Sequence, residues 1–137
     1  MLMVGNRRRF RLAVFVVLLL ASLQSAGCAK PSQATHDVVF SCDSDPMPPR
    51  VGPNTFTVVL SGRNDQRLAG ARVSLEGDMS HPGMSPVFGE AREIAPGQYR
   101  GTLDLNMLGD WVVVFHITLA NGESFDRQVE LQHIRAM

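Results

Sequence analysis

The stretch WVVVFHITLANGESFDRQVELQ, residues 111–132, decides the fold class. From Trp111 to Leu119 every second residue is large and apolar, and the positions between them include His116 and Thr118. A period of two is the pattern of a β-strand with one buried face. Asn121-Gly122 follows, and this dipeptide between two alternating runs is the strongest short signal for a β-hairpin. The stretch therefore predicts a long strand over 111–120 joined by a hairpin to a strand over 124–132.

The residues before this stretch continue the pattern. Short runs rich in Val, Phe, Thr and Ile are separated by Gly, Pro, Asn and Asp, with no convincing period of 3.6 residues. The segment DSDPMPPRVGP, residues 43–53, is excluded from a central strand because proline has no amide donor. The remaining predicted strands cover residues 37–41, 55–61, 71–77, 86–94 and 98–105.

Seven short strands at this spacing predict an all-β fold, a single immunoglobulin-like β-sandwich over residues 37–133. About 100 residues are enough to bury a core of this kind. Alternation within the strands predicts which side chains point inward. They are Phe56, Val58, Leu60, Val73, Leu75, Trp111, Val113, Phe115, Ile117 and Leu119.

The N-terminal residues 1–27 have the composition of an export signal. NRRRFR at 6–11 is basic, and it precedes an apolar run from Leu12 to Leu23. A membrane-spanning helix needs about 20 apolar residues, so this run is short for an anchor. A small residue directly before Cys28 resembles a bacterial lipobox, although Leu23 lies farther from the cysteine than is usual.

We therefore expect a lipoprotein-type signal peptide over residues 1–27, acylation of Cys28 and a tether over residues 28–36. Ordinary signal cleavage near Ala29 and an uncleaved anchor are the alternatives. A lipid anchor would attach the protein to a membrane of the cell envelope, on the periplasmic side of a Gram-negative-type bacterium. Ala29 after the cysteine favours the outer membrane.

The signal changes the charge of the mature protein. The whole chain has 13 basic and 13 acidic residues. Removal of Arg7, Arg8, Arg9 and Arg11 leaves nine basic residues against thirteen acidic ones, a net charge of about −4. An acidic surface argues against nucleic acid as a partner. Lipidation of Cys28 would leave Cys42 unpaired, and otherwise a disulfide between the two cysteines is the alternative.

Sequence motifs of catalysis are absent. The chain contains no G-x-S-x-G, H-E-x-x-H, G-x-G-x-x-G or C-x-x-C. Asp104 and Asp110 flank a turn, and we interpret them as solvated residues at a hairpin tip. Tyr99 follows Pro-Gly and is interpreted as a corner residue that holds the fold. We do not expect an enzyme.

The loop DMSHPGMSP, residues 78–86, is the candidate binding site. Pro82-Gly83 suits the centre of a type II turn, which brings His81 and Met84 close together. Met79 lies two residues before His81, on the same side of an extended segment. Thioethers select Cu(I), and imidazole also suits copper, so these three residues, with Met107 as a further candidate, could hold that ion. The alternative is that these methionines fill gaps in the core.

Several short motifs together resemble the YtkA-like domain, which is related to the periplasmic part of FixH proteins. They are Gly52-x-Asn54, Gly70-Ala71-Arg72-Val73, the Met/His loop, Pro96-Gly97-Gln98-Tyr99 and Gly109-Asp110-Trp111.

The resemblance covers residues 37–132 and implies a small β-sandwich outside the cytoplasmic membrane, linked to copper handling or metal efflux. Family loops run Met-Pro-x-Met or Met-Pro-Gly-His, whereas here the proline is displaced and a second histidine is missing. The alternative function is a metal-free envelope module that docks on a transporter or an oxidase-assembly partner.

Overall fold

The structure is a computed structural model, and it describes residues 37–136. The predicted signal peptide, the tether and the lipidation site Cys28 therefore lie outside the described residues. Within residues 37–136, no helix is long and apolar enough to cross a membrane.

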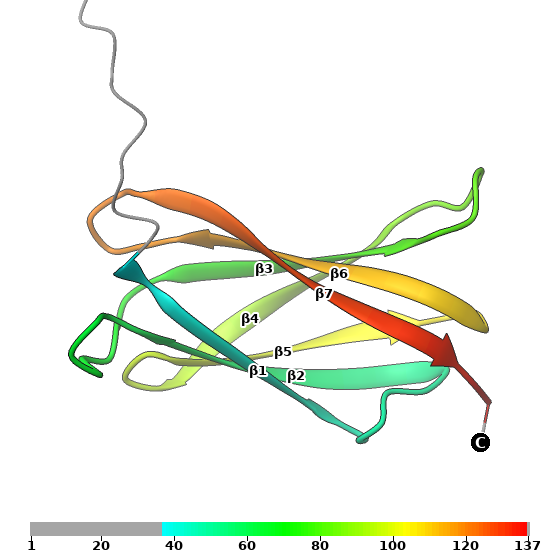
Figure 1. The fold of residues 1–137 in the computed structure, drawn as a ribbon, viewed down its shortest axis with the longest axis horizontal. Helices are drawn as coiled ribbons and strands as arrows, with labels where there is room; N and C mark the ends of the chain where they lie inside the picture. The colour runs from blue at the N-terminus through cyan, green and yellow to red at the C-terminus, as the bar shows by residue number, and fades with distance from the viewer. Residues whose placement is uncertain (1–36, 137) are drawn as a thin grey trace, which may run out of the picture. The chain divides into compact units, whose positions relative to one another are not determined.

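Seven antiparallel strands make up the fold (Figure 1). Neighbouring strands are hydrogen-bonded in the order β1-β2-β5-β4-β3-β6-β7, so that β1 and β7 are the edges of one continuous sheet. The predicted all-β class and the seven predicted strands are confirmed. The strands are β1 (Val39–Asp45), β2 (Gly52–Ser61), β3 (Arg72–Met79), β4 (Val87–Ala95), β5 (Gln98–Leu105), β6 (Gly109–Thr118) and β7 (Ser124–Ile134).

The exclusion of residues 43–53 from a central strand was wrong at its end, because β2 starts at Gly52 and includes Pro53. Pairing of β2 with β1 begins only at Thr55, so Pro53 has no bonded neighbour on that side.

The sheet folds over on itself to give a sandwich-like core. Phe115 on β6 packs against Phe40 on β1 and Phe56 on β2, with ring centroids 5.3 and 6.0 Å apart. Neither β1 nor β2 is a hydrogen-bonded neighbour of β6 in the sheet order, so these contacts cross between two layers. Edge-to-face and tilted ring pairs of this kind add to the stabilisation that comes from burying the rings.

Three glycines let β3, β4 and β5 pack closely where the sheet folds. A Cβ on Gly101 would lie 2.9 Å from Cδ1 of Leu75, and one on Gly77 would lie 2.9 Å from Cγ2 of Val87. A Cβ on Gly89 would overlap the carbonyl oxygen of Thr102. Glycine inside a strand marks such close approaches of backbone.

The core agrees with the predicted alternation. Nine of the ten predicted inward side chains are buried, and Leu119 is half-buried and packs against the core. Tyr99 is fully buried and its hydroxyl donates to the carbonyl oxygen of Leu68 at 2.7 Å, which confirms its role as a corner residue. The amide of Ala71 donates to the same hydroxyl at 2.9 Å.

The first strand is longer than predicted. β1 continues through Asp45, whereas the sequence pattern ended it at residue 41 and began a proline-rich connection at residue 43. Asp43 and Asp45 pair in register with Thr57 and Thr55 of β2, and both aspartates are exposed. An edge strand has one bonded neighbour only, so polar residues can extend it at little cost. The break comes at Pro46, which lacks the amide donor.

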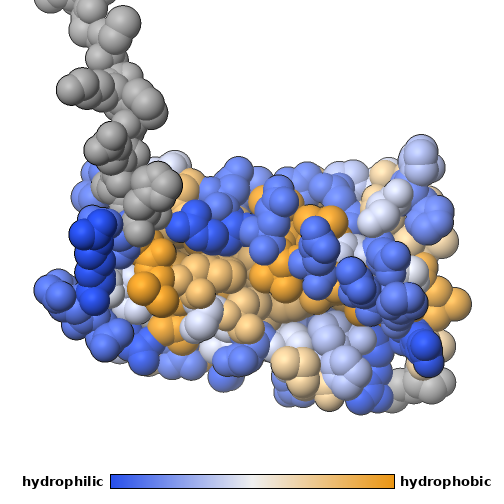
Figure 2. All heavy atoms as spheres, in the orientation of Figure 1, coloured by the Kyte–Doolittle hydropathy of each residue, from blue (hydrophilic) through white to orange (hydrophobic). Residues whose placement is uncertain are grey.

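The edges β1 and β7 leave an apolar band partly exposed on one face (Figure 2). Phe40 of β1 and Phe125 and Val129 of β7 are half-buried there and pack against the core. The guanidinium of Arg127 lies 4.6 Å from the centre of the Phe125 ring. A charged side chain in such a position discourages pairing of an edge strand with another chain.

Candidate functional site: the methionine end

The four methionines within residues 37–136 all lie at one end of the sheet. Met79 is the last residue of β3, and the others lie in the connections β1–β2 (46–51), β3–β4 (80–86) and β5–β6 (106–108). In Figure 1 these three connections and the end of β7 share the right-hand end of the molecule. We call it the methionine end, and it contains Met47, Met79, Met84 and Met107.

The β3–β4 connection is held against the start of β6. Met79 pairs in register with Trp111, and the amide of Ser80 donates to the carbonyl oxygen of Asp110 at 3.1 Å. Gly83 has a φ of 88°, which is the conformation that the third position of a type II turn requires. The predicted turn therefore forms, and His81 and Met84 lie on its exposed flanks.

Met79 differs from the two other residues of the predicted site. Its side chain is half-buried and packs against the core, with Cε 3.3 Å from where a Cβ on Gly109 would lie. Met84, in contrast, is 40% exposed. The loop thus presents one thioether to solvent and holds a second one partly inside, at the boundary of the core.

Met107 lies in the β5–β6 connection, at the same end of the sheet as the β3–β4 connection. The β5–β6 connection that carries it leads directly into Gly109, where an added Cβ would lie 3.3 Å from Cε of Met79. The indole Nε1 of Trp111 donates to the carbonyl oxygen of Met107 at 3.1 Å and fixes the connection. Met107 is 43% exposed, so it is not the core residue that the alternative interpretation expected.

Asn54 fixes the β1–β2 connection, which carries Met47. Asn54 is completely buried, and its Nδ2 donates to the carbonyl oxygens of Arg50 and Gly52 at 2.6 and 2.7 Å. Its Oδ1 accepts the amide of Arg50 at 3.0 Å. Every polar atom of the side chain is thereby paired, which burial of an amide demands. Met47 itself is 72% exposed.

His133 was not predicted as a site residue, yet it lies at this end. A bulge interrupts the pairing of β7 with β6, because Gly109 pairs with Ile134 but Trp111 pairs with Leu131. His133 sits in the bulge with a φ of 57°, and its amide donates to Oδ1 of Asp110 at 2.8 Å. Bulges re-aim side chains and break the alternation that sequence reasoning relies on. The hydrogen bond also gives Asp110 a structural role beyond that of a solvated residue.

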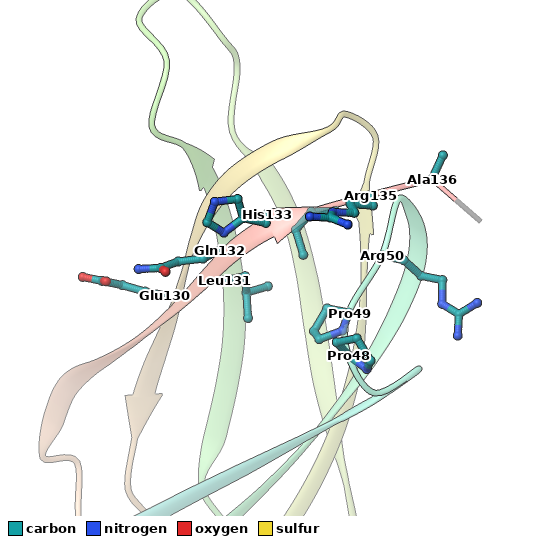
Figure 3. Close-up of a pocket in the computed structure, with 10 residues that line it drawn as sticks. Pro48, Pro49, Arg50, Glu130, Leu131, Gln132, His133, Arg135 and Ala136 are labelled. Atoms are coloured by element: carbon teal, nitrogen blue, oxygen red, sulfur yellow. The ribbon is translucent and has the colours of Figure 1, made fainter.

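A cleft with a volume of about 660 Å³ opens beside His133 (Figure 3). It separates the end of β7 from Pro48 and Pro49 in the β1–β2 connection, and the side chain of Arg50 extends away from β7. The amide of Val51 donates to the carbonyl oxygen of Arg135 at 3.0 Å and holds the two walls together. The lining of the cleft consists of Pro48, Pro49, Arg50 and residues 130–136.

Away from the methionine end, His116 bridges two strands. Its Nε2 lies 2.8 Å from Oε2 of Glu76 on β3, and its Nδ1 lies 2.9 Å from Oδ1 of Asp126 on β7. The hydrogen bonds to Glu76 and then to Asp126 raise the pKa of His116 above its usual value. Both ring nitrogens are occupied, and the two carboxylates lie on opposite sides of the ring. The three side chains therefore form a salt-bridge network rather than a set of metal ligands.

Within residues 37–136, no three His, Cys, Asp or Glu side chains are grouped so that they could hold a metal ion. Thioethers are a different class of ligand, and they gather at the methionine end. Neutral sulfur ligands favour Cu(I) over harder ions. In chemical terms, the donors at this end fit a soft monovalent ion better than zinc or calcium.

Cys42 lies in the middle of β1 with a half-buried, free thiol. Burial, and secondly the charge of Asp43, raise the pKa of the Cys42 thiol to about 11. The thiolate is the metal ligand and the nucleophile, so a raised pKa makes this cysteine unreactive near neutral pH. The alternative disulfide with Cys28 involves a residue outside the described part of the chain.

The described residues thus define a class of protein, an all-β sandwich-like domain that carries its methionines and two histidines at one end. The model of the YtkA-like family matches residues 33–116, which is more than half of the chain, and the chain belongs to this family. The resemblance seen in the short motifs is confirmed. The matched segment ends within β6, so β7 lies beyond it.

No curated protein matches the chain. Among solved structures, that of murine CRIg is similar over 72% of this chain and 99% of that chain, with 8% sequence identity and a TM-score of 0.39. Similarity at this level supports no conclusion about the function of this protein.

Proposed function

We propose that this protein is an exported, lipid-anchored domain that binds or passes Cu(I) at the methionine end. The observation that carries the proposal is that all four methionines within residues 37–136 lie at this end, with Met84 and Met107 both accessible to solvent. A methionine that only fills a gap in the core would be buried, whereas Met84 and Met107 are 40% and 43% exposed.

The proposed ligands are Met79, His81 and Met84, with Met107 as a further one. Met84 and His81 flank one tight turn, and Met79 lies at the base of the same connection. Met79 packs against the core, so a rotation of its flexible side chain would bring the sulfur outward to the ion. A partly buried thioether of this kind would allow uptake and release without unfolding of the strand. The proposed role is binding and not catalysis.

The test is a titration of residues 29–137 with Cu(I) against a competing chelator under reducing conditions. Cys42 is replaced by alanine throughout so that no thiol competes for the ion. The site variant is Met79→Leu together with Met84→Leu, because leucine keeps the packing volume and removes the sulfur. The control is Met47→Leu, which removes a sulfur from the β1–β2 connection, outside the proposed ligand set.

Tight 1:1 binding that is lost in the site variant and retained in the Met47→Leu control would support the loop as the copper site. Equal losses in both variants would assign the ion to a wider set of methionines. Weak binding that is the same in all three proteins would contradict a copper site.

A second candidate function is a metal-free envelope module that docks on a transporter or an oxidase-assembly protein. The observation that favours it is the exposed apolar character of the methionine end, where Leu108 and Met47 are 59% and 72% exposed. Solvent-exposed methionine and leucine side chains suit an adaptable protein interface. Weak, equal Cu(I) binding in the titration above would favour this candidate.

A further inference from the structure

Three arginines form a row across three neighbouring strands. Arg92 of β4 lies directly opposite Arg100 of β5. The pairing of Val73 with Ala91 continues antiparallel to place Arg72 of β3 beside Arg92. We call Arg72, Arg92 and Arg100 the arginine row.

The arginine row lies on the outside of the folded sheet. All three side chains are exposed, whereas their chain neighbours Val73, Tyr99 and Gly101 are buried and face the core. Glu90 is the carboxylate two residues from Arg92 on the same face. Within residues 37–136, none of the three arginines forms a salt bridge, with Glu90 or with any other acidic side chain.

This arrangement is unfavourable for the isolated domain. Like charges directly opposite each other on neighbouring strands destabilise a sheet. Residues 37–136 contain eight arginines and no lysine against thirteen Asp and Glu residues, a net charge of about −5. An acidic domain with many carboxylates has nonetheless left three adjacent cations without a partner. An anionic surface outside the domain would supply the negative charge that these three arginines lack within the fold.

The position of the arginine row indicates which surface this is. Arg72 is the first residue of β3, and Arg92 and Arg100 flank the β4–β5 hairpin, so the row lies at the end of the sheet opposite the methionine end. Strand β1 starts at this same end, since Val39 pairs with Ser61 at the end of β2. Arg67, in the connection between β2 and β3, adds another exposed basic residue there, whereas Arg63 in the same connection is paired with Asp37.

The chain therefore enters the domain at the end that carries the arginine row. Ten residues separate Cys28 from Val39, and even a fully extended chain of that length spans only about 35 Å. A lipid on Cys28 would keep this end, and not the methionine end, close to the membrane surface. Ile94, which lies between Arg92 and the hairpin tip, is 46% exposed and would suit the interface between headgroups and acyl chains.

We propose that the arginine row binds the anionic headgroups of the membrane that carries the lipid anchor and orients the domain with its methionine end away from the bilayer. The orientation rests on the lipid anchor of the proposed function, whereas the affinity for anionic lipid does not. Each basic residue near an anionic surface adds to binding, and the attraction falls off within a Debye length. The short tether favours a membrane over an acidic protein as the partner.

The test is flotation of residues 29–137 with vesicles, without an acyl group and without copper. The described core lies entirely within residues 37–136, so this chain retains all of it. Vesicles of equimolar phosphatidylglycerol and phosphatidylcholine are compared with pure phosphatidylcholine at low and high salt. The row variant is Arg92→Gln with Arg100→Gln. The control variant is Arg50→Gln with Arg135→Gln, which removes the same charge from the methionine end, and thermal unfolding checks that both variants fold.

We expect binding to the anionic vesicles only, weakened by salt, and a loss of about thirtyfold in the row variant, because each of the two removed basic residues contributes about fivefold. The control variant should bind within about twofold of the wild type.

Absence of binding to anionic vesicles at low salt, or equal losses in both variants, would overturn the proposal. Retention of polyglutamate by the wild type but not by the row variant, without vesicle binding, would assign the arginine row to an acidic protein instead. Because neither copper nor an acyl group on the protein is used, a negative result would leave the copper proposal standing, and the copper titration tests that proposal separately.

Discussion

His116 illustrates how one residue can tie three strands together. It lies on β6 and accepts or donates through both ring nitrogens, to Glu76 on β3 and to Asp126 on β7. The side chain is 41% exposed, so water screens the charges and reduces what the network contributes to stability. The network still couples the protonation of one imidazole to the stability of the β3-β6-β7 layer.

The pKa of His116 is raised, by the hydrogen bond to Glu76 first and by that to Asp126 second, which means that folding favours the imidazolium. Its contribution to stability is fully present below about pH 6.5, the ordinary value for an unfolded histidine, and is lost as the pH rises through the higher folded value. We predict that the difference in unfolding free energy between wild type and His116→Gln shrinks as the pH is raised from below 6.5, measured by urea denaturation.

The matched control is His81→Gln, since His81 forms no salt bridge within residues 37–136. That substitution removes no described salt bridge, so the unfolding free energy of the variant should stay close to that of the wild type. A difference for His116→Gln that stays constant, or grows with pH, would mean that the carboxylates do not stabilise the charged ring.

At the residue scale, local sequence predicted some roles and missed others. Tyr99 follows Pro-Gly in a family motif, and its role at a corner was predictable. The network of His116 was not, because Glu76 lies 40 residues away and only strand register brings it near. The same holds for His133, whose bulge is invisible to a pattern of period two.

At the scale of elements, the close packing of β3, β4 and β5 depends on positions without a side chain. Gly89 lies opposite Leu75 on β3, and a Cβ there would overlap the carbonyl oxygen of Thr102 on β5. Backbone cannot move aside as a flexible side chain can. Strand β4 can therefore lie this close to its neighbours only because residue 89 has no Cβ.

We predict that Gly89→Ala lowers the unfolding free energy by about 1–3 kcal/mol, the usual range for an overpacked interior. The measurement is chemical denaturation with the transition followed by the fluorescence of Trp111. Gly62→Ala is the control, because its Cβ would meet only the carbonyl oxygen of Gln66 at 3.9 Å, an ordinary contact. Equal effects of both substitutions would show that the close approach at Gly89 is relieved by a small shift of the sheet.

Strand positions were predictable, whereas boundaries were missed at the edge strand β1 and at the start of β2, which begins at Gly52 rather than at residue 55. The central strands alternate and end at Gly, Pro or Asn, so local sequence identifies them. β1 runs four residues beyond its predicted end because Asp43 and Asp45 find backbone partners on β2 while their side chains remain in water. Polar composition indicates exposure, and on an edge strand exposure does not mean the absence of a strand.

At the scale of the whole molecule, the two ends of the sandwich have different chemistry. Thioethers and two imidazoles gather at one end, and five of the eight arginines within residues 37–136 gather at the other. The chain enters the domain at the arginine-bearing end. This polarity gives the proposed anchor and the proposed copper site opposite positions on the domain.

We predict that Cys28→Ala moves the protein from the membrane fraction to the soluble fraction, as measured by fractionation of cells that express the full chain. The reason is that an acyl chain on Cys28 would be the anchor that holds the domain. Cys42→Ala is the control and should remain in the membrane fraction. Unchanged membrane association of the Cys28 variant would instead indicate an uncleaved apolar segment.

The sequence by itself determined the all-β class, most strand positions, the buried faces and the tight turn between His81 and Met84. Each of these depends on neighbours within a few residues, through alternation, proline, glycine and turn chemistry. Only the tertiary structure decided that methionines from separate connections share one end, and that Arg72, Arg92 and Arg100 stand side by side. The first fact depends on pairing between strands that are far apart in the chain, such as β2 with β5 and β3 with β6, which no local pattern encodes. The second depends on strand register, which the turn of the β4–β5 hairpin and the burial of the alternating apolar face set together.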